Sequence, residues 1–376
     1  MSTVLETALL PTYPETKVGF VEGDGMWLTG SDGKRYLDFA AGIAVVSLGH
    51  RHPAPLAAAH AQLDKLWHTS NLFATEPDVE LARILSDRFG GAHAFFCNSG
   101  TEANEAALKY ARKATGKPGV IALEGSFHGR TLGALAVTGQ ASKRATFEPL
   151  GPAHFAQPND IASLHAAADD DVGLVLLEPV LGEGGVIPLD AEFVAAAAQL
   201  ATELGALLAF DEIQTGVGRT GTFFAFEQLG VKPQLVTLAK ALANGLPIGC
   251  LLVADDAPQA FVAGDHGSTF GGNPVACAAA AAVCAEIDDE LLANVSARGA
   301  QLARGLSALP GVTEVRGKGL LLGAVVDDAA PIADAALDAG LVCLTAGKNV
   351  LRLAPPLVVG ENDVELALAI LTEVTR

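Results

Sequence analysis

The chain has 376 residues, 50% of them hydrophobic, which predicts a globular protein with one large and one smaller domain. Its formal net charge of −19 disfavours nucleic acid and anionic membrane surfaces as partners, because an acidic protein repels phosphate groups. The sequence opens without a signal segment, contains no membrane-spanning apolar run and scatters five cysteines without a CxxC pair, which predicts a cytoplasmic protein.

The first predicted element is a β-hairpin near the N-terminus. Residues Met26–Phe39 contain two strand-like pieces around the turn signal SDG. His50, Arg51 and His52 follow, directly before Pro53. Because no thiol or carboxylate stands at metal-ligand spacing from them, we interpret this stretch as a turn and predict no metal site.

Short apolar runs that alternate with helical patterns predict an α/β fold, with a mostly parallel sheet covered by helices on both faces. The runs are Ala94–Cys97, Val120–Leu123, Gly173–Leu177, Ala206–Phe210, Leu235–Leu238 and Ile248–Ala254. In such sheets, ligands bind beyond the carboxyl ends of the strands. We therefore expect the functional site just after these runs, where the chain places Asn98, Phe127, Glu178, Asp211 and Lys240.

The C-terminal part is predicted to begin with the alanine-rich helix Pro274–Glu286 and to add strands at Leu320–Val326 and Val350–Leu353. These elements are typical of a smaller α+β unit, to which the N-terminal segment is expected to contribute. We therefore predict a small domain formed by residues 1–50 and 276–376, and a large domain formed by residues 51–275.

The segment FFCNSGTE predicts a strand, a tight turn and the start of a helix. Ser99 and Glu102 have the spacing of a capping box, and Gly116 marks the end of the helix. Gly100 lets a ligand approach the backbone, and the first-turn N–H groups with the Thr101 hydroxyl predict an anion site. A well-capped helix without a ligand is the alternative. The absence of GxxxxGK[ST] argues against a nucleotide P-loop.

Two charged residues follow buried strands farther along the chain. Asp211 comes directly after Ala206–Phe210, and Lys240 comes shortly after Leu235–Leu238. A carboxylate at the end of a buried strand is destabilising unless it is paired, so Asp211 needs a cation or a strong hydrogen-bond donor. A direct salt bridge between Asp211 and Lys240 is the simple interpretation, and a cofactor between them is the more specific hypothesis.

Pyridoxal phosphate makes three demands that these residues meet. Its ring nitrogen needs a carboxylate, its aldehyde condenses with a lysine amine, and its phosphate needs a helix N-terminus. Asp211, Lys240, and the turn at Gly100 and Thr101 match these demands in the same order. Lys240 is then expected to act a second time, as the base that moves a proton on the substrate carbon.

Motifs along nearly the entire chain resemble those of class III aminotransferases: NSGTEANEAALK, SFHGRT, EPVLGEGG, FDEIQTGVGRTG, LAKALANGLPIG, HGSTFGGNP and VLRLAPPL. The resemblance implies a fold-type I PLP-dependent transferase that works as a homodimer with active sites shared between the subunits. FHGRT, HGSTFGGNP and VLRLAPPL look most like the subfamily that acts on acetylornithine and 2-oxoglutarate in arginine biosynthesis.

The same resemblance implies roles for individual residues. Phe127 stacks on the cofactor ring, Gln214 contacts its phenolic oxygen, and Thr269 reaches the phosphate of the neighbouring subunit's cofactor. Lys240, Asp211 and Glu183 form the expected catalytic set. The expected cofactor-binding residues are Ser99, Gly100, Thr101, Phe127, His128, Asp211, Gln214, Lys240 and Thr269.

A transaminase of this type has to bind two substrates whose carboxylates lie at different distances from the reacting amine, and the arginine fork suits a carboxylate. By resemblance, Arg130 binds the far carboxylate and Arg352 binds the near α-carboxylate of glutamate. Glu183 is the residue that neutralises Arg352 when acetylornithine is bound. Ser268 and Tyr13 are the remaining implied substrate contacts, although Lys17 stands where a proline is common in the family.

We therefore predict transamination between acetylornithine and 2-oxoglutarate. The alternatives within the family are transaminases of ornithine, succinylornithine, 4-aminobutyrate or a lysine-pathway semialdehyde. A nucleotide-binding dehydrogenase is disfavoured, because no GxGxxG opens a first strand-turn-helix unit. A ligand-binding homologue without activity is disfavoured too, because Lys240, Asp211 and both arginines are present.

Overall fold

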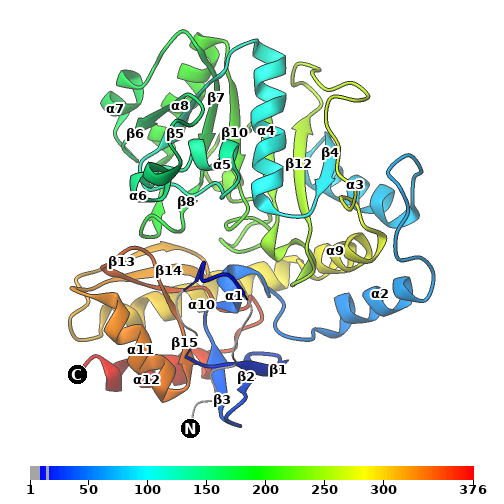
Figure 1. The fold of residues 1–376 in the computed structure, drawn as a ribbon. Coiled ribbons are helices and arrows are strands. Elements are labelled where there is room, and N and C mark those ends of the chain that lie inside the picture. Colours follow the sequence, from blue (N-terminus) through cyan, green and yellow to red (C-terminus); the bar gives the residue numbers. More distant parts are fainter. Residues whose placement is uncertain (1–8, 14–16) are drawn as a thin grey trace.

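The computed structural model describes residues 9–13 and 17–376, arranged in an upper and a lower lobe (Figure 1). The upper lobe is built on a seven-stranded sheet with the order β4-β12-β11-β10-β7-β5-β6, in which β12 alone runs antiparallel to its neighbours. Its strands are β4 Ala92–Cys97, β5 Gly119–Leu123, β6 Ala153–Ala156, β7 Val172–Leu177, β10 Leu207–Asp211, β11 Leu235–Leu238 and β12 Gly249–Ala254. The predicted helix-covered, mostly parallel sheet is confirmed.

Both faces of this sheet are covered because the strands are apolar on both sides. Val120 and Ala122 of β5 pack in one cluster with α4, whereas Ile121 and Leu123 pack in another with α8. The helices of the chain are α1 Ala41–Ala44, α2 Pro53–Leu63, α3 Glu76–Phe89, α4 Gly100–Thr115, α5 Leu132–Ala136, α6 Ala141–Arg144, α7 Ile161–Ala166, α8 Ala191–Leu204, α9 Pro274–Glu286, α10 Asp289–Ser307, α11 Ala329–Ala339 and α12 Glu361–Val374. None of the described helices is long and apolar enough to cross a lipid bilayer.

The lower lobe joins the two ends of the chain. Strand β3 pairs in parallel with β15, and Leu37 lies opposite Leu341. Its two four-stranded sheets have the orders β1-β2-β3-β15 and β13-β14-β17-β16. The strands are β1 Phe20–Asp24, β2 Trp27–Gly30, β3 Arg35–Asp38, β13 Glu314–Lys318, β14 Leu321–Val325, β15 Leu341–Val342, β16 Leu344–Thr345 and β17 Val350–Leu353. The division into residues 1–50, 51–275 and 276–376 stays a prediction.

Short segments connect these layers. A two-stranded sheet formed by β8 Val180–Leu181 and β9 Ile187–Pro188 follows β7. Three 3-10 helices, η1 Ala145–Phe147, η2 Ala225–Gln228 and η3 Lys240–Ala243, lie in loops of the upper lobe. The last of these begins at Lys240, so the predicted strand end and the lysine are linked by a tight turn.

The local sequence signals are mostly confirmed, with one difference in the helix cap. Helix α4 begins after Ser99, whose Oγ accepts from Glu102 N at 3.3 Å, and it ends at the left-handed Gly116. A capping box would place the Glu102 carboxylate on the Ser99 backbone N–H. Instead, it accepts from Asn98 N at 2.7 Å, which tightens the turn one residue earlier.

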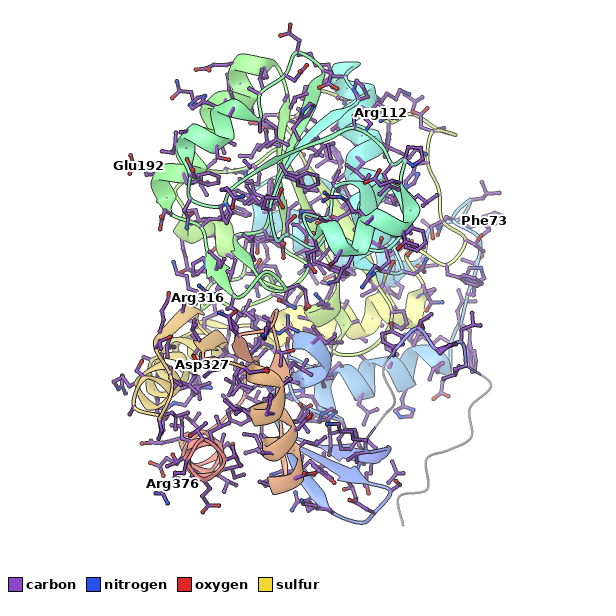
Figure 2. All side chains as sticks on the ribbon, turned by 60° about the vertical axis from the view of Figure 1, so that its left-hand side comes forward. Phe73, Arg112, Glu192, Arg316, Asp327 and Arg376 are labelled. Carbon is purple, nitrogen blue, oxygen red and sulfur yellow. The ribbon has the colours of Figure 1, made fainter. Side chains whose placement is uncertain are left out.

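Arg316 and Arg219 are among the arginines that connect the two lobes. Arg316 of β13 donates from Nε to the Gly185 carbonyl at 2.7 Å, near the junction seen in Figure 2. Arg219 is fully buried and donates to the carbonyls of Leu320 and Pro355 and to Ser47 Oγ. Burial lowers the pKa of Arg219 to about 9, which leaves it charged at neutral pH. Arg219 therefore fastens the loop after β10 to both ends of the chain.

Replacing Arg219 with lysine is expected to lower the free energy of unfolding by about 2–4 kcal/mol, because a single ammonium group cannot reproduce a fork that reaches three acceptors. Urea unfolding of the cofactor-free protein, followed by circular dichroism, measures this loss. Arg304→Lys on the exposed face of α10 is the matched control and should change stability by less than about 0.5 kcal/mol. Equal urea midpoints for Arg219→Lys and Arg304→Lys would contradict the role of Arg219 in fastening the loop after β10 to the two ends of the chain.

Candidate functional site

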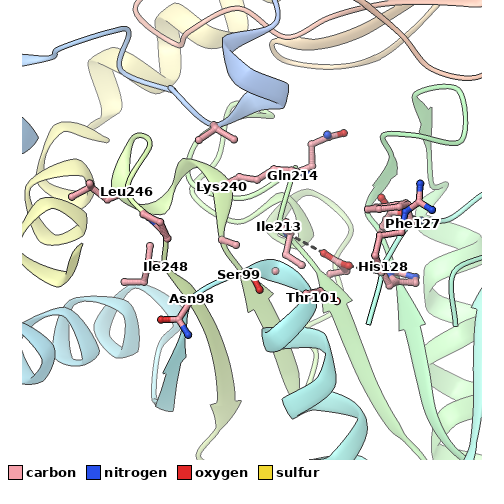
Figure 3. Close-up of a pocket in the computed structure, with 18 of the residues that line it drawn as sticks. Asn98, Ser99, Thr101, Phe127, His128, Ile213, Gln214, Lys240, Leu246 and Ile248 are labelled. Carbon is pink, nitrogen blue, oxygen red and sulfur yellow. Dashed lines mark hydrogen bonds and ion pairs between the residues drawn. The ribbon is translucent and has the colours of Figure 1, made fainter. Parts of the chain in front are cut away.

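A cavity of about 380 Å³ opens at the carboxyl ends of the central strands (Figure 3). The position agrees with the rule that ligands of doubly wound sheets bind at this edge. The predicted residues that line it are Ser99, Gly100, Thr101, Phe127, His128, Arg130, Asp211, Gln214 and Lys240. The structure therefore brings together every predicted cofactor-binding residue except Thr269.

The N-terminus of α4 forms one wall of the cavity. Its first-turn N–H groups have no partners within the helix and can bind an anion. Ser99, Gly100 and Thr101 all line the cavity at this point. A Cβ atom at Gly100 would lie 2.7 Å from Ile213 Cδ1, so only glycine fits between the turn and the loop after β10.

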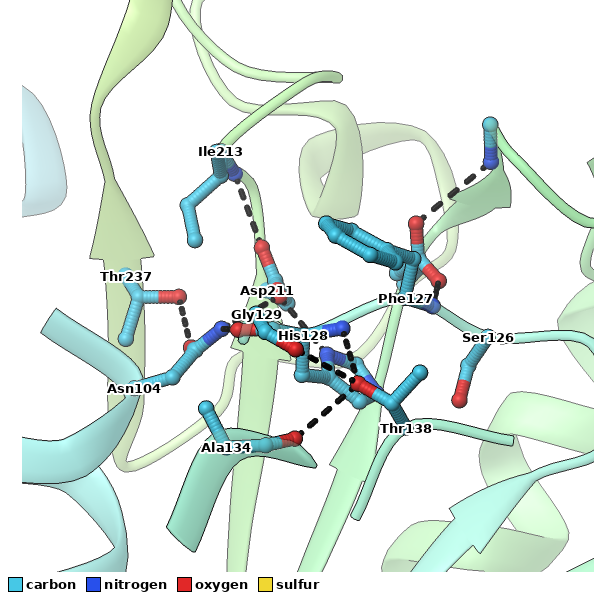
Figure 4. A network of polar contacts seen from close by, with 12 residues as sticks. Asn104, Ser126, Phe127, His128, Gly129, Ala134, Thr138, Asp211, Ile213 and Thr237 are labelled. Carbon is cyan, nitrogen blue, oxygen red and sulfur yellow. Dashed lines mark hydrogen bonds and ion pairs between the residues drawn. The ribbon is translucent and has the colours of Figure 1, made fainter. Parts of the chain in front are cut away.

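A network of hydrogen bonds holds Asp211 at the end of β10 (Figure 4). Its Oδ2 accepts from Asn104 Nδ2 at 2.8 Å and lies 2.7 Å from His128 Nδ1, while its Oδ1 accepts from Ile213 N at 3.1 Å. Thr237 in turn donates to Asn104 Oδ1 at 2.9 Å. Asp211 is thus paired with His128 and not with Lys240, and the simple salt-bridge interpretation is wrong for the part of the chain that the structure describes.

His128 is almost fully buried and its charge depends on this pair. Burial acts to lower the pKa of His128, but the hydrogen bond and the negative charge of Asp211 outweigh it and raise that pKa overall. The ring therefore carries positive charge more readily than a free histidine, and it compensates the Asp211 carboxyl group.

Lys240 also lines the cavity, and its backbone is strained. Its φ of +42° lies in the left-handed region, which a residue with a side chain occupies only when the surroundings impose it. Burial lowers the pKa of the Lys240 amine, against the opposing effects of Asp211 and Glu183. A lowered pKa leaves more of the neutral amine, which is the nucleophilic form.

Two buried polar atoms of residues that line this cavity, His128 Nε2 and Gln214 Oε1, have no hydrogen-bond partner among residues 9–13 and 17–376. Buried polar atoms are normally paired, so these two indicate where a ligand completes the network. The other groups of the cavity fit parts of pyridoxal phosphate: the α4 N-terminus fits its phosphate, and the Asp211 carboxyl group fits its ring nitrogen. The Lys240 amine fits its aldehyde, and the Phe127 ring fits the face of its ring. The cavity meets the demands predicted from the sequence.

The two residues predicted to handle the near carboxylate form an ion pair. Arg352 of β17 is buried, and its Nη1 donates to the Glu183 carboxylate and to the Gly182 carbonyl. The positive charge of Arg352 outweighs burial and holds the pKa of Glu183 below its usual range. Neither Glu183 nor Arg352 lines the cavity, but Gly182, which Arg352 contacts, lies directly against the Gln214 side chain, which does.

Three predicted residues lie elsewhere in the single chain. Thr269 is exposed and, with Ser268, lines a separate open pocket of about 850 Å³. Ser268 Oγ nevertheless accepts from Asn98 Nδ2 at 3.1 Å, and Asn98 lines the first cavity. Tyr13 is 85% exposed and lines neither pocket. The proposed roles of these residues stay predictions.

Sequence reasoning assigned no role to two residues of the site. Asn104 bridges Asp211, Thr237 and the His128 carbonyl from within α4. Its signal was an amide on the otherwise alanine-rich buried face of that helix. Glu178 accepts from Phe127 N at 2.8 Å, and burial raises the pKa of Glu178 to about 7. It stood at a strand end, as expected of a site residue, but its function as an anchor for Phe127 required the folded geometry.

Glu212 supports the site from behind. It is buried beside Asp211, and its carboxyl group accepts from Ala225 N at 2.7 Å and Phe226 N at 2.8 Å. Burial raises the pKa of Glu212 to about 8, although the two N–H donors act in the opposite direction. The loop that carries Gln214 is therefore closed by a buried carboxyl group that holds its proton more readily than an exposed one.

Known proteins resemble this chain over nearly its whole length. A family model described as aminotransferase class III matches residues 11–375. The acetylornithine aminotransferase of Mycolicibacterium smegmatis is 48% identical over 376 residues, which cover 98% of this chain and 96% of that protein. The solved N-acetylornithine aminotransferase of Stenotrophomonas maltophilia has a TM-score of 0.84 and 38% identity, with 96% of each chain covered. The ornithine aminotransferase of Toxoplasma gondii, with partial occupancy of PLP at its active site, has a TM-score of 0.92 and 30% identity over 98% of this chain and 92% of its own.

The buried carboxyl group of Glu212 predicts a specific pH dependence of stability. Unfolding returns its pKa from about 8 to the ordinary 4.5, so between these values the folded state holds a proton that the unfolded state has lost. Raising the pH through this window therefore destabilises the fold. In Glu212→Gln, the loss of unfolding free energy between pH 6 and pH 9 should shrink by at least about 1 kcal/mol.

Urea unfolding at the two pH values measures this difference. Glu365→Gln on the exposed side of α12 is the control and should retain the slope of the unaltered protein. If Glu212→Gln also retains that slope, Glu212 is ionised in the folded state and the interpretation is wrong.

Proposed function

The chain belongs to the class III aminotransferases, and we propose that it transfers the δ-amino group of N2-acetyl-L-ornithine to 2-oxoglutarate in arginine biosynthesis. The products are N-acetyl-L-glutamate 5-semialdehyde and L-glutamate. The observation that carries this proposal is the 48% identity, over 98% of this chain, to the acetylornithine aminotransferase of Mycolicibacterium smegmatis. The ornithine aminotransferase that shares the fold makes free ornithine the rival donor.

Pyridoxal phosphate, when bound, supplies an aldehyde that exchanges the amino group and a ring that accepts electron density from the substrate carbon. The α4 N-terminus with Thr101 would hold the phosphate, Phe127 would pack on the ring, and the Gln214 side-chain amide would donate to the phenolic oxygen. Asp211 would hold a proton on the ring nitrogen, and Asn104 and His128 keep that carboxyl group in place.

Lys240 carries out the proton transfer. Its Nζ would take the proton from the substrate carbon that bears the amine and deliver it, within the same half-reaction, to the cofactor carbon that receives the amino group. The lowered pKa of Lys240 suits a base that has to work near neutral pH.

Two arginines orient the substrates. Arg130, exposed at the mouth of the cavity, binds the far carboxylate of either substrate. Arg352 binds the near carboxylate of glutamate and 2-oxoglutarate, for which it has to leave Glu183. When acetylornithine is bound, no near carboxylate is present and the pair with Glu183 keeps Arg352 neutralised, because an unpaired buried cation is costly.

We also propose that the protein acts as a homodimer in which Ser268 and Thr269 complete the neighbouring subunit's cavity. Two observations support this arrangement. Both residues line an open pocket outside the first cavity. Two large apolar side chains are exposed close to them: Phe73 lines the same pocket, and Phe270 follows Thr269 in the sequence. Exposed apolar surface of this kind marks interaction sites.

Activity and absorption measurements test the proposed reaction. Adding acetylornithine alone to the PLP-loaded protein should bleach its visible band, and subsequent 2-oxoglutarate should restore the band with release of glutamate. Lys240→Ala is expected to lower turnover at least about 100-fold, because it removes the general base. A kcat/KM for ornithine or 4-aminobutyrate that exceeds the value for acetylornithine would replace the proposed donor with that amine.

The arrangement of Arg352 and Glu183 predicts opposite effects on the two half-reactions. Arg352→Met should raise the KM for 2-oxoglutarate about 10- to 100-fold and that for acetylornithine less, because only 2-oxoglutarate presents a near carboxylate. Glu183→Gln should impair the acetylornithine half-reaction more than the glutamate half-reaction, because it leaves Arg352 unpaired in the first of these.

Stopped-flow measurement of each half-reaction separates the two effects. Arg304→Met on α10 provides a control for the loss of an arginine outside the site. Equal losses in both half-reactions for both variants would show that the pair has only a structural role.

A further inference from the structure

Lys143 is a cation beside the cavity that the mechanism does not use. It belongs to α6 and is half-buried, and its Nζ lies 4.8 Å from the centroid of the Phe127 ring. The guanidinium carbon of Arg130 lies 5.6 Å from the same centroid. Phe127, which Figure 3 labels, and Arg130 both line the cavity. Lys143 and Arg130 therefore present two positive charges around one aromatic ring at the cavity wall.

The charges that act on Lys143 are those of the substrate site. Burial lowers the pKa of Lys143, Glu183 opposes that effect, and Arg130 and Arg352 reinforce it. Among the residues that the structure describes, no oxygen accepts a hydrogen bond from Lys143 Nζ, whose direct contact is the Phe127 ring. An ammonium group has three donors, so Lys143 keeps its donors available for a ligand.

A second lysine shows what a purely structural version of this contact looks like. Lys232 lies 4.5 Å from the centroid of the Phe89 ring, is exposed, and donates to the Gly90 carbonyl at 3.2 Å. Its ammonium group has an acceptor in the protein. Neither lysine lines a described cavity, but Phe127, which Lys143 contacts, does, whereas Phe89 does not. Lys143 contacts its ring in the same way but has no such acceptor among the described residues, and the charges of Glu183, Arg130 and Arg352 act on it.

The position of Lys143 bears on the part of the substrate farthest from the reacting amine. If Arg130 holds the far carboxylate, the α-carbon that bears this carboxylate and its α-nitrogen lie beside Arg130. A free amino acid carries an ammonium group there, and like charges in a binding site cost affinity. An N-acyl amide is uncharged, and its carbonyl oxygen can accept a hydrogen bond from a lysine.

We propose that Lys143 is a specificity-determining residue, which makes the site select donors with an acylated α-nitrogen over donors with a free α-ammonium group. The inference rests on the proposed function, because Arg130 has to hold the far carboxylate. It narrows the substrate class to N-acylated diamino acids and gives a physical reason for rejecting ornithine.

Three amine donors isolate this effect. 5-Aminopentanoate, ornithine and N2-acetylornithine share the reacting amine and the far carboxylate and differ only at the α-carbon, which bears hydrogen, an ammonium group or an acyl amide. In Lys143→Met, kcat/KM for ornithine relative to 5-aminopentanoate should rise about tenfold, because the repulsion is lost. The value for acetylornithine relative to 5-aminopentanoate should fall about three- to tenfold, because a hydrogen bond is lost.

Two further variants control the test. Lys143→Arg keeps the charge and should leave ornithine as disfavoured as in the unaltered protein. Lys232→Met removes a lysine with the same ring contact outside the site and should change neither ratio. Equal losses of kcat/KM for all three donors in Lys143→Met would show that Lys143 only supports Phe127. An unchanged kcat/KM for ornithine relative to 5-aminopentanoate would also overturn the proposal.

A binding measurement separates recognition from turnover. N-acetyl-L-norvaline carries the acylated α-nitrogen and the carboxylate but lacks the reacting amine. Its dissociation constant for the PLP-loaded protein, measured by calorimetry, should rise about three- to tenfold in Lys143→Met and remain unchanged in Lys232→Met. Failure of the unaltered protein to use acetylornithine would contradict the proposed function, whereas unchanged donor ratios in an active enzyme would contradict only the role of Lys143.

Discussion

The site depends on the pairing of Asp211 at the carboxyl end of a fully buried strand. A carboxyl group in that position is destabilising unless donors surround it, and here Asn104, His128 and the Ile213 N–H supply them. The donors come from a helix, from the loop after β5 and from the loop after β10. The contacts of this one carboxyl group therefore fix the relative positions of α4, the loop after β5 and the loop after β10. These three segments carry most of the residues proposed to bind the cofactor.

The substrate face is decided by contacts between the lobes. Arg352 belongs to β17 of the lower lobe, whereas Glu183 belongs to the segment that follows β7 of the upper lobe. Arg219 donates to the Pro355 carbonyl, three residues beyond Arg352, from the loop after β10 that also carries Gln214. The same loop therefore holds the cofactor side and positions the strand that binds the substrate carboxylate.

Several features of the fold followed from local patterns. The apolar runs that became β4, β5, β7, β10, β11 and β12 were recognised, because strands covered on both faces are apolar throughout. The edge strand β6, Ala153–Ala156, was not, because its sequence AHFA is short and contains a histidine. Asn104 was missed for a related reason: its importance comes from facing Asp211, which lies 107 residues away in the sequence.

The sequence by itself determined the sheet edge, the helix N-terminus and the chemical types of the catalytic set, because strand ends, caps and unpaired charges leave local signals. Only the tertiary structure decided which charges are partners. It paired Asp211 with His128 instead of Lys240 and placed Lys143 beside Arg130 on one ring, whereas the family resemblance had already implied the pair of Glu183 and Arg352. Electrostatic pairing depends on distance and burial in space, and neither can be read from separations along a chain.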